Sequence, residues 1–338
     1  MRHLWIIGCI LLWTLGWGTY HLDRNPRMWF DDGLAAWTAK TFIETGAYGI
    51  RLNSTTIATN PFWLTTGPTV ILPTALSFKF LGKGILQARF PMVIYLLVLV
   101  SSIWLFVHSI SRPLIAHTSA FLVATFSPFY GNGKTLLGEN PGLAFLFLGL
   151  WLWNKGIKDN EHIMWFQGLS GLCFGLTILS KPTYLLVILA IMIGWIIHHR
   201  PITVTKNLLL FWLPILLCGV LWLYVIVPLP LTKDGIRETA QFLTRGYWGE
   251  TGPQEWLTNL LRFFHESTPI HAATLIALWV GVWKKRKQHL SFTETILSIW
   301  IVLHLIWYLK TPCWYRYFYP IHVTALVLAP VALDRISL

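Results

Sequence analysis

The run Pro91–Ile110, PMVIYLLVLVSSIWLFVHSI, holds twenty residues without one Asp, Glu, Lys or Arg. A helix of about 20 apolar residues is long enough to cross the hydrocarbon core of a bilayer. Similar apolar runs recur along the 338 residues, of which 55% are hydrophobic and 12% charged. The 20 Trp and 11 Tyr suit the membrane–water interface, where an apolar ring carries a polar tip. This pattern predicts an all-α polytopic membrane protein.

The formal charge of +12 comes from 26 basic and 14 acidic residues. In a membrane protein such an excess marks cytoplasmic loops or anionic lipid ligands, so we expect no nucleic-acid partner. The four cysteines show neither metal-like spacing nor a disulfide framework. Residues 1–20 have a basic start and an apolar core but no clear small-x-small cleavage site, which favours an uncleaved first span over a signal peptide.

The basic tetrad Lys284–Lys287 is the strongest marker of the cytoplasmic side. Counting from it places every short basic cluster on one side and gives ten spans with both chain ends in the cytoplasm. The predicted spans are 4–20, 91–110, 114–130, 141–153, 166–180, 183–198, 207–228, 270–283, 293–309 and 321–333.

The outward loops are then 21–90, 131–140, 229–269 and 310–320. Within the first, the apolar segment 68–82 is short and contains Pro73 and Lys79, which favours a re-entrant or surface helix. The alternative, that it spans, would put the basic tetrad outside. We expect one integral membrane domain over 1–338, without a separate soluble domain.

An acidic pair, Asp31-Asp32, precedes an amphipathic stretch that should lie on the outer surface and stop at Gly46. One interpretation is that the pair only caps this helix. The other is that a carboxylate here acts as a base. Glu139 lies in an outer loop on the same side, although it could simply begin a helix ahead of Pro141. Two such acids could bind a divalent cation, Mg²⁺ or Mn²⁺, or orient and deprotonate a hydroxyl group.

Cations are predicted on the same side of the membrane. Two of them, Lys310 and Arg316, lie in the aromatic stretch Lys310–Pro320, KTPCWYRYFYP. Lys181 lies where Pro182 should break a hairpin of two spans. Such a loop suits an anionic headgroup on an apolar tail, and lipid phosphate is the natural candidate. Interfacial aromatics with snorkelling cations are the alternative. The candidate phosphate ligands are Arg89, Lys181, Lys310 and Arg316.

In this order, the motifs resemble those of the GT-C superfamily of membrane glycosyltransferases. The nearest branch holds protein O-mannosyltransferases and the aminoarabinose transferase of lipid A. Asp32 stands where that branch has Glu, Glu139 where Asp is usual, and Gly67 where Lys is frequent. The matching segments are Asp31–Gly46, Gly67-Pro68, Ser77–Gly82, Ala88–Pro91, Glu139, Gly171–Pro182 and Lys310–Pro320.

The resemblance implies a GT-C-like bundle of about ten transmembrane helices, with amphipathic surface helices in the first outer loop. It also implies inverting transfer of a sugar from a polyprenyl-phosphate donor to a hydroxyl of a glycan, lipid or protein on the non-cytoplasmic face. The expected catalytic residues are Asp31, Asp32 and Glu139, with Asp31 as general base and with Asp31 and Glu139 as the candidate ligands of a divalent cation.

The small size and the absence of a eukaryotic retention tail favour a prokaryotic inner membrane. Two other functions stay open at this point. A transporter or lipid flippase would also have many spans, but such folds usually show internal repeats and polar groups near the midplane, and we find no repeat. A non-catalytic membrane scaffold is the third.

Overall fold

The computed structural model describes residues 2–58, 66–158, 162–198, 206–226, 232–241, 253–266, 268–284, 290–309, 311 and 314–336. Within these ranges the regular secondary structure is helical apart from one short antiparallel hairpin, β1 (Ile50–Arg51) and β2 (Ile57–Ala58). Ten helices correspond in position to the ten predicted spans. They are α1 (Arg2–Thr19), α4 (Ile85–Ile110), α5 (Pro113–Ala124), α7 (Glu139–Lys158), α8 (Ile163–Ser180), α9 (Leu185–Ile197), α10 (Lys206–Ile226), α13 (Pro269–Lys284), α14 (Phe292–Leu309) and α15 (Tyr315–Ile336).

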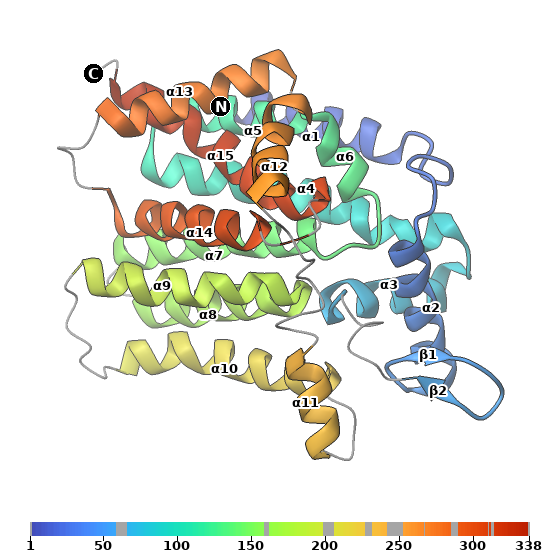
Figure 1. The fold of residues 1–338 in the computed structure, drawn as a ribbon. Helices are drawn as coiled ribbons and strands as arrows, with labels where there is room; N and C mark the ends of the chain where they lie inside the picture. Colours follow the sequence, from blue (N-terminus) through green and yellow to red (C-terminus); the bar gives the residue numbers. More distant parts are fainter. Residues whose placement is uncertain are drawn as a thin grey trace.

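Four of the apolar helices are long and apolar enough to cross a membrane, which makes the protein an integral membrane protein. They are Ile85–Ile110, Ile163–Ser180, Phe292–Leu309 and Tyr315–Asp334, and further apolar helices are shorter. Helix α8 packs against both α7 and α10, helix α4 packs against α7, and helix α9 packs against α14 (Figure 1). Large apolar side chains on the outside of the bundle, such as Trp5 and Trp165, are exposed as expected for a surface that faces lipid.

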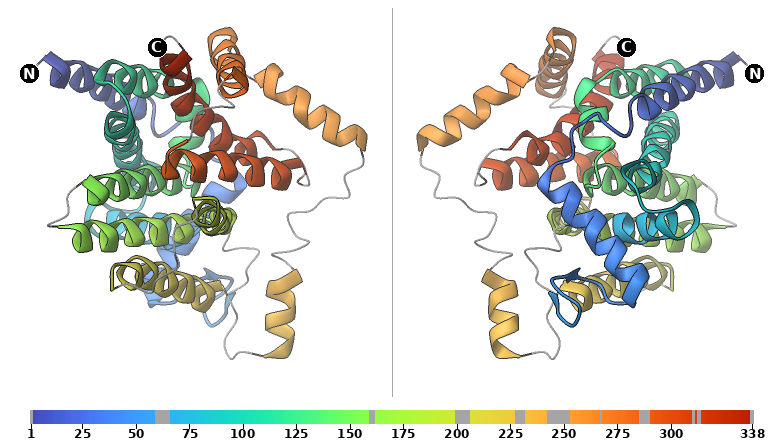
Figure 2. Two further views of the ribbon diagram at one scale, coloured as in Figure 1. Left: turned by 90° about the vertical axis from the view of Figure 1, so that its left-hand side faces the viewer. Right: turned by 90° about the vertical axis from the view of Figure 1, so that its right-hand side faces the viewer.

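The remaining helices lie outside this set. They are α2 (Phe30–Thr45), α3 (Pro68–Leu81), α6 (Ser127–Gly133), η1 (Pro182–Tyr184), α11 (Lys233–Gln241) and α12 (Pro253–Glu266). Helix α2 and the hairpin lie at one end of the bundle (Figure 1). Helices α11 and α12 extend away from the bundle on one side (Figure 2). At 14 residues, α3 is about 21 Å long, shorter than a bilayer core of about 30 Å.

The predicted span 114–130 is wrong as a continuous helix. Helix α5 ends at Ala124, Phe126 is extended, and α6 begins at Ser127 with Pro128 in its first turn. The break follows from Pro128, because proline has no N–H with which to continue a helix and fits best in a first turn.

The predicted cytoplasmic ends of several spans meet at the opposite end of the bundle from α2. Arg112, just before α5, forms an ion pair with Asp334 near the end of α15. Lys158 Nζ, at the end of α7, donates to the carbonyl oxygen of Ser109 at 2.8 Å. These contacts join loops that the charge pattern placed on one side. Of the basic tetrad, Lys285–Lys287 lie outside the described residues.

Candidate active site

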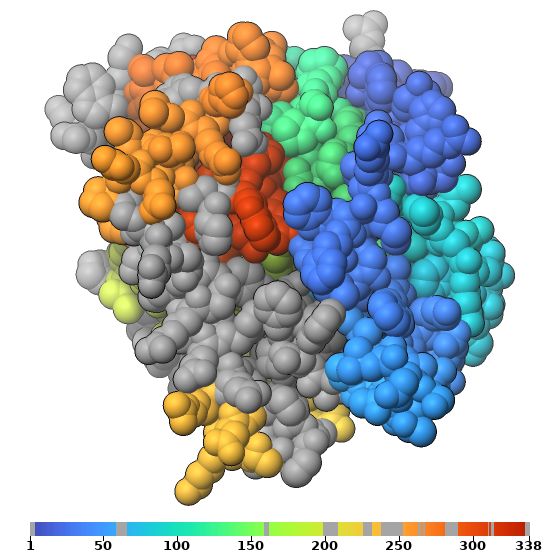
Figure 3. Space-filling model, turned by 45° about the vertical axis from the view of Figure 1, so that its right-hand side comes forward, coloured from blue at the N-terminus to red at the C-terminus, as the bar shows by residue number. Residues whose placement is uncertain are grey.

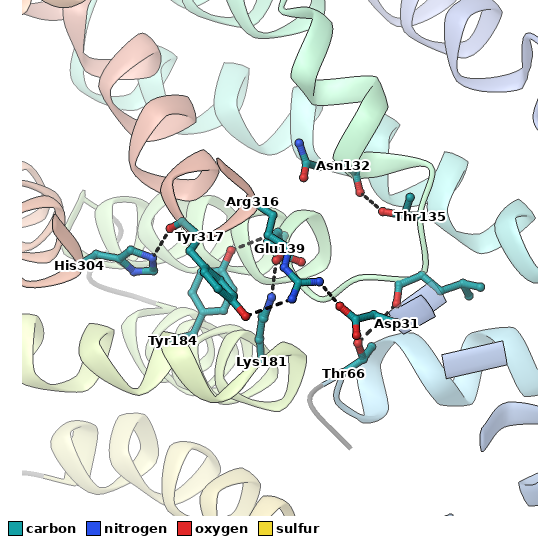
Figure 4. A network of polar contacts seen from close by, with 11 residues as sticks. Asp31, Thr66, Asn132, Thr135, Glu139, Lys181, Tyr184, His304, Arg316 and Tyr317 are labelled. Atoms are coloured by element: carbon teal, nitrogen blue, oxygen red, sulfur yellow. Dashed lines mark hydrogen bonds and ion pairs between the residues drawn. The ribbon is translucent and has the colours of Figure 1, made fainter. Parts of the chain in front are cut away.

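The first turn of α2 and the first turn of α15 meet through an ion pair between Asp31 and Arg316 (Figure 4). The two side chains are 18% and 15% exposed, so the pair lies at the edge of the protein interior. Arg316 Nη2 also donates to the hydroxyl of Tyr317 at 3.0 Å, while its Nε has no hydrogen-bond partner. A carboxylate and a guanidinium that solvent can reach are therefore held side by side.

Helix α2 shows that the acidic pair does not cap it. The N-cap residue is Trp29, which has extended backbone and no side-chain capping bond, and both acids lie within the first helical turn. At this position their negative charges still interact favourably with the positive end of the helix dipole. The predicted stop at Gly46 is confirmed, since Gly46 is left-handed with φ 74°.

Asp32 is buried in a second ion pair. Its Oδ2 accepts from Arg89 Nη2 at 2.5 Å and its Oδ1 accepts from the backbone N–H of Leu136 at 2.7 Å. Arg89 Nη1 donates to the carbonyl oxygens of Leu22 and Pro26, at 3.1 and 2.8 Å. Because both side chains are 0% exposed, neither reaches a substrate in this arrangement. The pair instead ties α2 to α4 and to the loop before α7.

Glu139 and Lys181 form a third ion pair, which is buried. The side chains are 2% and 6% exposed, and Glu139 Oε1 is bound by Lys181 Nζ. The other carboxylate oxygen, Oε2, is buried and has no hydrogen-bond partner. Tyr184 donates from its hydroxyl to the Glu139 carbonyl oxygen at 2.6 Å, which fixes the start of α7 against η1.

Tyr317 connects the Asp31–Arg316 pair with the Glu139–Lys181 pair. Its hydroxyl accepts from Arg316, and its ring centroid lies 5.2 Å from Lys181 Nζ, within cation–π distance. Its carbonyl oxygen accepts from His304 Nε2 at 3.1 Å. Figure 4 shows the resulting series, Asp31, Arg316, Tyr317, Lys181 and Glu139, drawn from α2, α15, α7 and the α8–η1 break. The sequence offered Tyr317 only as one of several interfacial aromatics.

The α8–η1 break brings these elements together because two glycines let other segments approach it. A Cβ built on Gly67 would overlap the carbonyl oxygen of Leu179, and one built on Gly138 would overlap that of Ser180. Gly67 also donates its N–H to the Ser180 carbonyl oxygen at 3.0 Å. Lys181 follows directly in extended backbone, ahead of Pro182, as the predicted hairpin break requires. Close backbone packing thus sets where Lys181 lies.

Exposed indoles border the Asp31–Arg316 pair. The rings of Trp29 and Trp314 meet edge to face with centroids 6.3 Å apart, and Trp314 lies 4.6 Å from Arg316 Cζ. In Figure 3 the blue surface of the α2 region lies beside an orange-red surface from the C-terminal helices. Lys310, also a predicted phosphate ligand, lies outside the described residues.

Lys134 is a buried cation outside the motifs that the sequence offered. Its Nζ donates to the carbonyl oxygen of Tyr20 at 2.8 Å. Burial, and secondarily the charge of Arg89, lowers the pKa of the Lys134 ammonium from its usual value. The only signal in the sequence was its position in an outer loop.

The described part of the chain contains no group of three or more His, Cys, Asp and Glu side chains that could hold a metal ion. Asp31 and Glu139, the predicted ligands, are each bound by a cationic side chain. Two carboxylates already neutralised in this way make a poor donor set for Mg²⁺ or Mn²⁺.

Residues 65–229 match the family model for dolichyl-phosphate-mannose-protein mannosyltransferase. No curated protein matches the chain. Among solved structures, it is similar to ArnT from Cupriavidus metallidurans bound to undecaprenyl phosphate, with 15% identity and a TM-score of 0.71 over 98% of this chain and 60% of that one.

ArnT in the apo state matches with 16% identity and a TM-score of 0.66, over 98% of this chain and 59% of that one. The Archaeoglobus fulgidus oligosaccharyltransferase in complex with Zn and sulfate matches at 13% identity and a TM-score of 0.65, over 98% of this chain and 49% of that one. The chain thus spans about half to three fifths of the length of these proteins. This chain has the fold of these proteins, the GT-C-like helical bundle that the sequence resemblance implied.

Proposed function

We propose that this chain is an inverting glycosyltransferase that moves a sugar from a polyprenyl-phosphate donor to a hydroxyl group of a glycan, lipid or protein. The observation that carries the proposal is the network of two carboxylates and two cations joined through Tyr317 at one end of the bundle. The family model over residues 65–229 and the GT-C fold support it. Transfer needs a base for the acceptor and positive charge for the leaving phosphate, and this network supplies both.

Asp31 is the proposed general base. It is the most exposed of the three predicted acids, whereas Asp32 is wholly buried against Arg89 and Glu139 has one of its two carboxylate oxygens bound by Lys181. The acceptor hydroxyl gives its proton to Asp31 while its oxygen attacks the anomeric carbon from the face opposite the phosphate. The bond from that carbon to the phosphate oxygen breaks, and its electron pair leaves with the polyprenyl phosphate. That leaving group needs no proton.

Arg316 and Lys181 are the proposed ligands of the phosphate, and Lys310 stays a candidate on its sequence position alone. Each would stabilise charge that develops as the phosphate departs, and this effect is larger in a water-poor site. Asp32 and Arg89 receive different roles from those expected from sequence. We assign them to positioning, because their pair fixes the α2 turn that carries Asp31.

Glu139 is proposed to orient the acceptor hydroxyl through Oε2, the oxygen without a hydrogen-bond partner. A buried carboxylate oxygen left unpaired is costly, so a hydroxyl donor that reaches it would be favoured. No step of this mechanism is assigned to a divalent cation, because Arg316 and Lys181 bind the carboxylates of Asp31 and Glu139 in this structure.

The site is proposed to face the non-cytoplasmic side of a prokaryotic cell membrane. The support is the charge pattern. Basic clusters mark the loops at the Arg112–Asp334 end of the bundle, and the candidate site lies at the other end.

The test compares the purified protein with Asp31→Asn in lipid nanodiscs, each supplied with a panel of polyprenyl-phosphate sugars and a lipid-glycan extract. Thermal unfolding curves of separate samples first establish that the two proteins are equally folded. Released polyprenyl phosphate is then measured for each. We expect release by the unmodified protein and loss of at least about 100-fold in Asp31→Asn, as for removal of a general base. Asp23→Asn, in an exposed pair with Arg24, is the control. Equal release by Asp31→Asn removes Asp31 from the chemistry.

A further inference from the structure

The cations proposed to bind the donor phosphate are both already bound by carboxylates. Arg316 holds Asp31, and Lys181 holds Glu139. A phosphate is an anion that uses the same N–H donors as a carboxylate, and a guanidinium fork suits either. A donor phosphate would therefore compete with Asp31 for Arg316 Nη1.

The same contact restrains the proposed base. In this contact the Asp31 Oδ2 atom accepts a hydrogen bond from Arg316 Nη1. While this ion pair is formed, that oxygen is therefore not free to accept a proton from a hydroxyl group.

We propose that the donor phosphate displaces Asp31 from Arg316, so that binding of the donor releases the base. This inference rests on the proposed function and adds an order to it: the acceptor is activated only after the donor has bound. The exchange breaks the ion pair between Asp31 and Arg316 and forms one between the phosphate and Arg316, with no covalent change.

The surroundings of the pair suit such an exchange. Asp31 and Arg316 are both partly exposed. The pair formed by the next residue of α2, Asp32, with Arg89 is fully buried. Arg316 keeps the Tyr317 hydroxyl and the Trp314 ring as partners when it loses Asp31. Its guanidinium therefore stays in place to receive the phosphate.

The neighbouring pair also keeps the released base where it is needed. Asp32 is held by Arg89 Nη2 and by the backbone N–H of Leu136, so the first turn of α2 is anchored independently of Arg316. Asp31 would then be freed from its cation without leaving the site. The fixed and the exchangeable ion pair thus have separate roles.

The first experiment measures binding of undecaprenyl phosphate and dolichyl phosphate, without sugar, to the full chain in nanodiscs. If the carboxylate competes with phosphate, Asp31→Asn binds the lipid about tenfold more tightly than the unmodified protein, because a charged partner of Arg316 has been removed. Arg316→Gln binds it more weakly. The double variant Asp31→Asn/Arg316→Gln binds the lipid as weakly as Arg316→Gln, because removing the carboxylate has no effect once Arg316 is absent. Asp23→Asn is the matched acid-to-amide control on an exposed surface pair.

Equal or weaker binding by Asp31→Asn, together with weaker binding by Arg316→Gln, overturns the exchange and leaves the donor site intact. Absence of binding to the unmodified protein overturns the proposed function itself. A second measurement uses the unmodified protein, so it does not depend on any variant folding. A water-soluble carbodiimide with glycine ethyl ester should label Asp31 faster when undecaprenyl phosphate is bound, while Asp32 stays unlabelled in both states. Unchanged labelling of Asp31 contradicts the exchange.

Discussion

Asp32 and Arg89, 57 positions apart, form an ion pair from which solvent is wholly excluded. The adjacent Asp31 is in a pair that solvent reaches, with Arg316. Two consecutive aspartates thus have opposite environments. The buried one is fixed by an arginine and a backbone N–H, and the exposed one projects into the candidate site. This division explains how a single helical turn can be rigid and still present a carboxylate for chemistry.

Replacing Arg89 with Met should strongly destabilise the protein. The change leaves the Asp32 carboxylate buried without its cation, a loss that typically costs about 3–5 kcal/mol. Thermal unfolding followed by tryptophan fluorescence at a fixed scan rate measures the effect. The paired variant Asp32→Asn/Arg89→Met should recover part of the loss, because no buried charge is then uncompensated. Arg24→Gln removes an exposed pair and should change the midpoint little. A stable Arg89→Met protein would show that the pair does not anchor α2.

Gly138→Ala should disturb the site without touching a charged group. The added methyl group would overlap the carbonyl oxygen of Ser180, which cannot move without displacing Lys181. We expect a lower unfolding midpoint and a loss of transfer. Gly33→Ala is the matched control, since a Cβ there meets nothing within 4 Å and alanine favours the helix by about 1 kcal/mol. The close approach would be unimportant if both alanine variants behaved alike.

The stability of the protein should depend on pH through Lys134. Burial lowers the pKa of its ammonium in the folded state below the 10.5 of an unfolded chain. Between the lowered pKa of the folded state and 10.5, the unfolded chain therefore binds more protons than the folded one. Stability from this group consequently rises with pH through that window.

The measurement compares unfolding midpoints of the unmodified protein and Lys134→Met from pH 7.5 to pH 10. The difference between them should grow in favour of the unmodified protein as pH increases. The hydrogen bond from Lys134 to the Tyr20 carbonyl oxygen is lost at every pH, so it shifts the difference but not its slope. A flat difference would mean that Lys134 is not desolvated in the folded protein.

Lys181→Met and Glu139→Gln should separate folding from function at the buried pair. Lys181→Met alone leaves Glu139 charged and uncompensated, and we expect it to destabilise the protein by about 3–5 kcal/mol. The double variant removes both charges and should regain much of that stability while lacking transfer. Released polyprenyl phosphate and the unfolding midpoint, measured on the same samples, test the two parts. Transfer retained by the double variant would leave the pair with a structural role only.

The helices were largely predictable because their signals are local. Pro182 and Gly46 ended helices as expected, since proline lacks an N–H and glycine tolerates positive φ. The break at Pro128 carried the same kind of signal, and the apolar residues on both sides obscured it.

The pairing of charges could not be predicted, because the partners lie far apart in sequence. Asp31 and Arg316 are 285 positions apart, and Glu139 and Lys181 are 42 apart. Hydropathy places such residues on the same side of the membrane but cannot tell which acid faces which base. The burial of Arg89 depends on Leu22 and Pro26, whose carbonyl oxygens no sequence pattern identifies as its acceptors.

The proposed orientation can be tested by labelling single cysteines from outside the cell. Lys40 lies exposed on α2 near the site, and Lys158 lies exposed where α7 ends, at the opposite end of the bundle. In a variant whose four native cysteines have been replaced, Lys40→Cys should react with a membrane-impermeant maleimide on intact spheroplasts. Lys158→Cys should react only after permeabilisation, because the basic loops that mark its end stay in the cytoplasm. The reverse pattern would put the site in the cytoplasm, where an acceptor would have to be a cytoplasmic molecule.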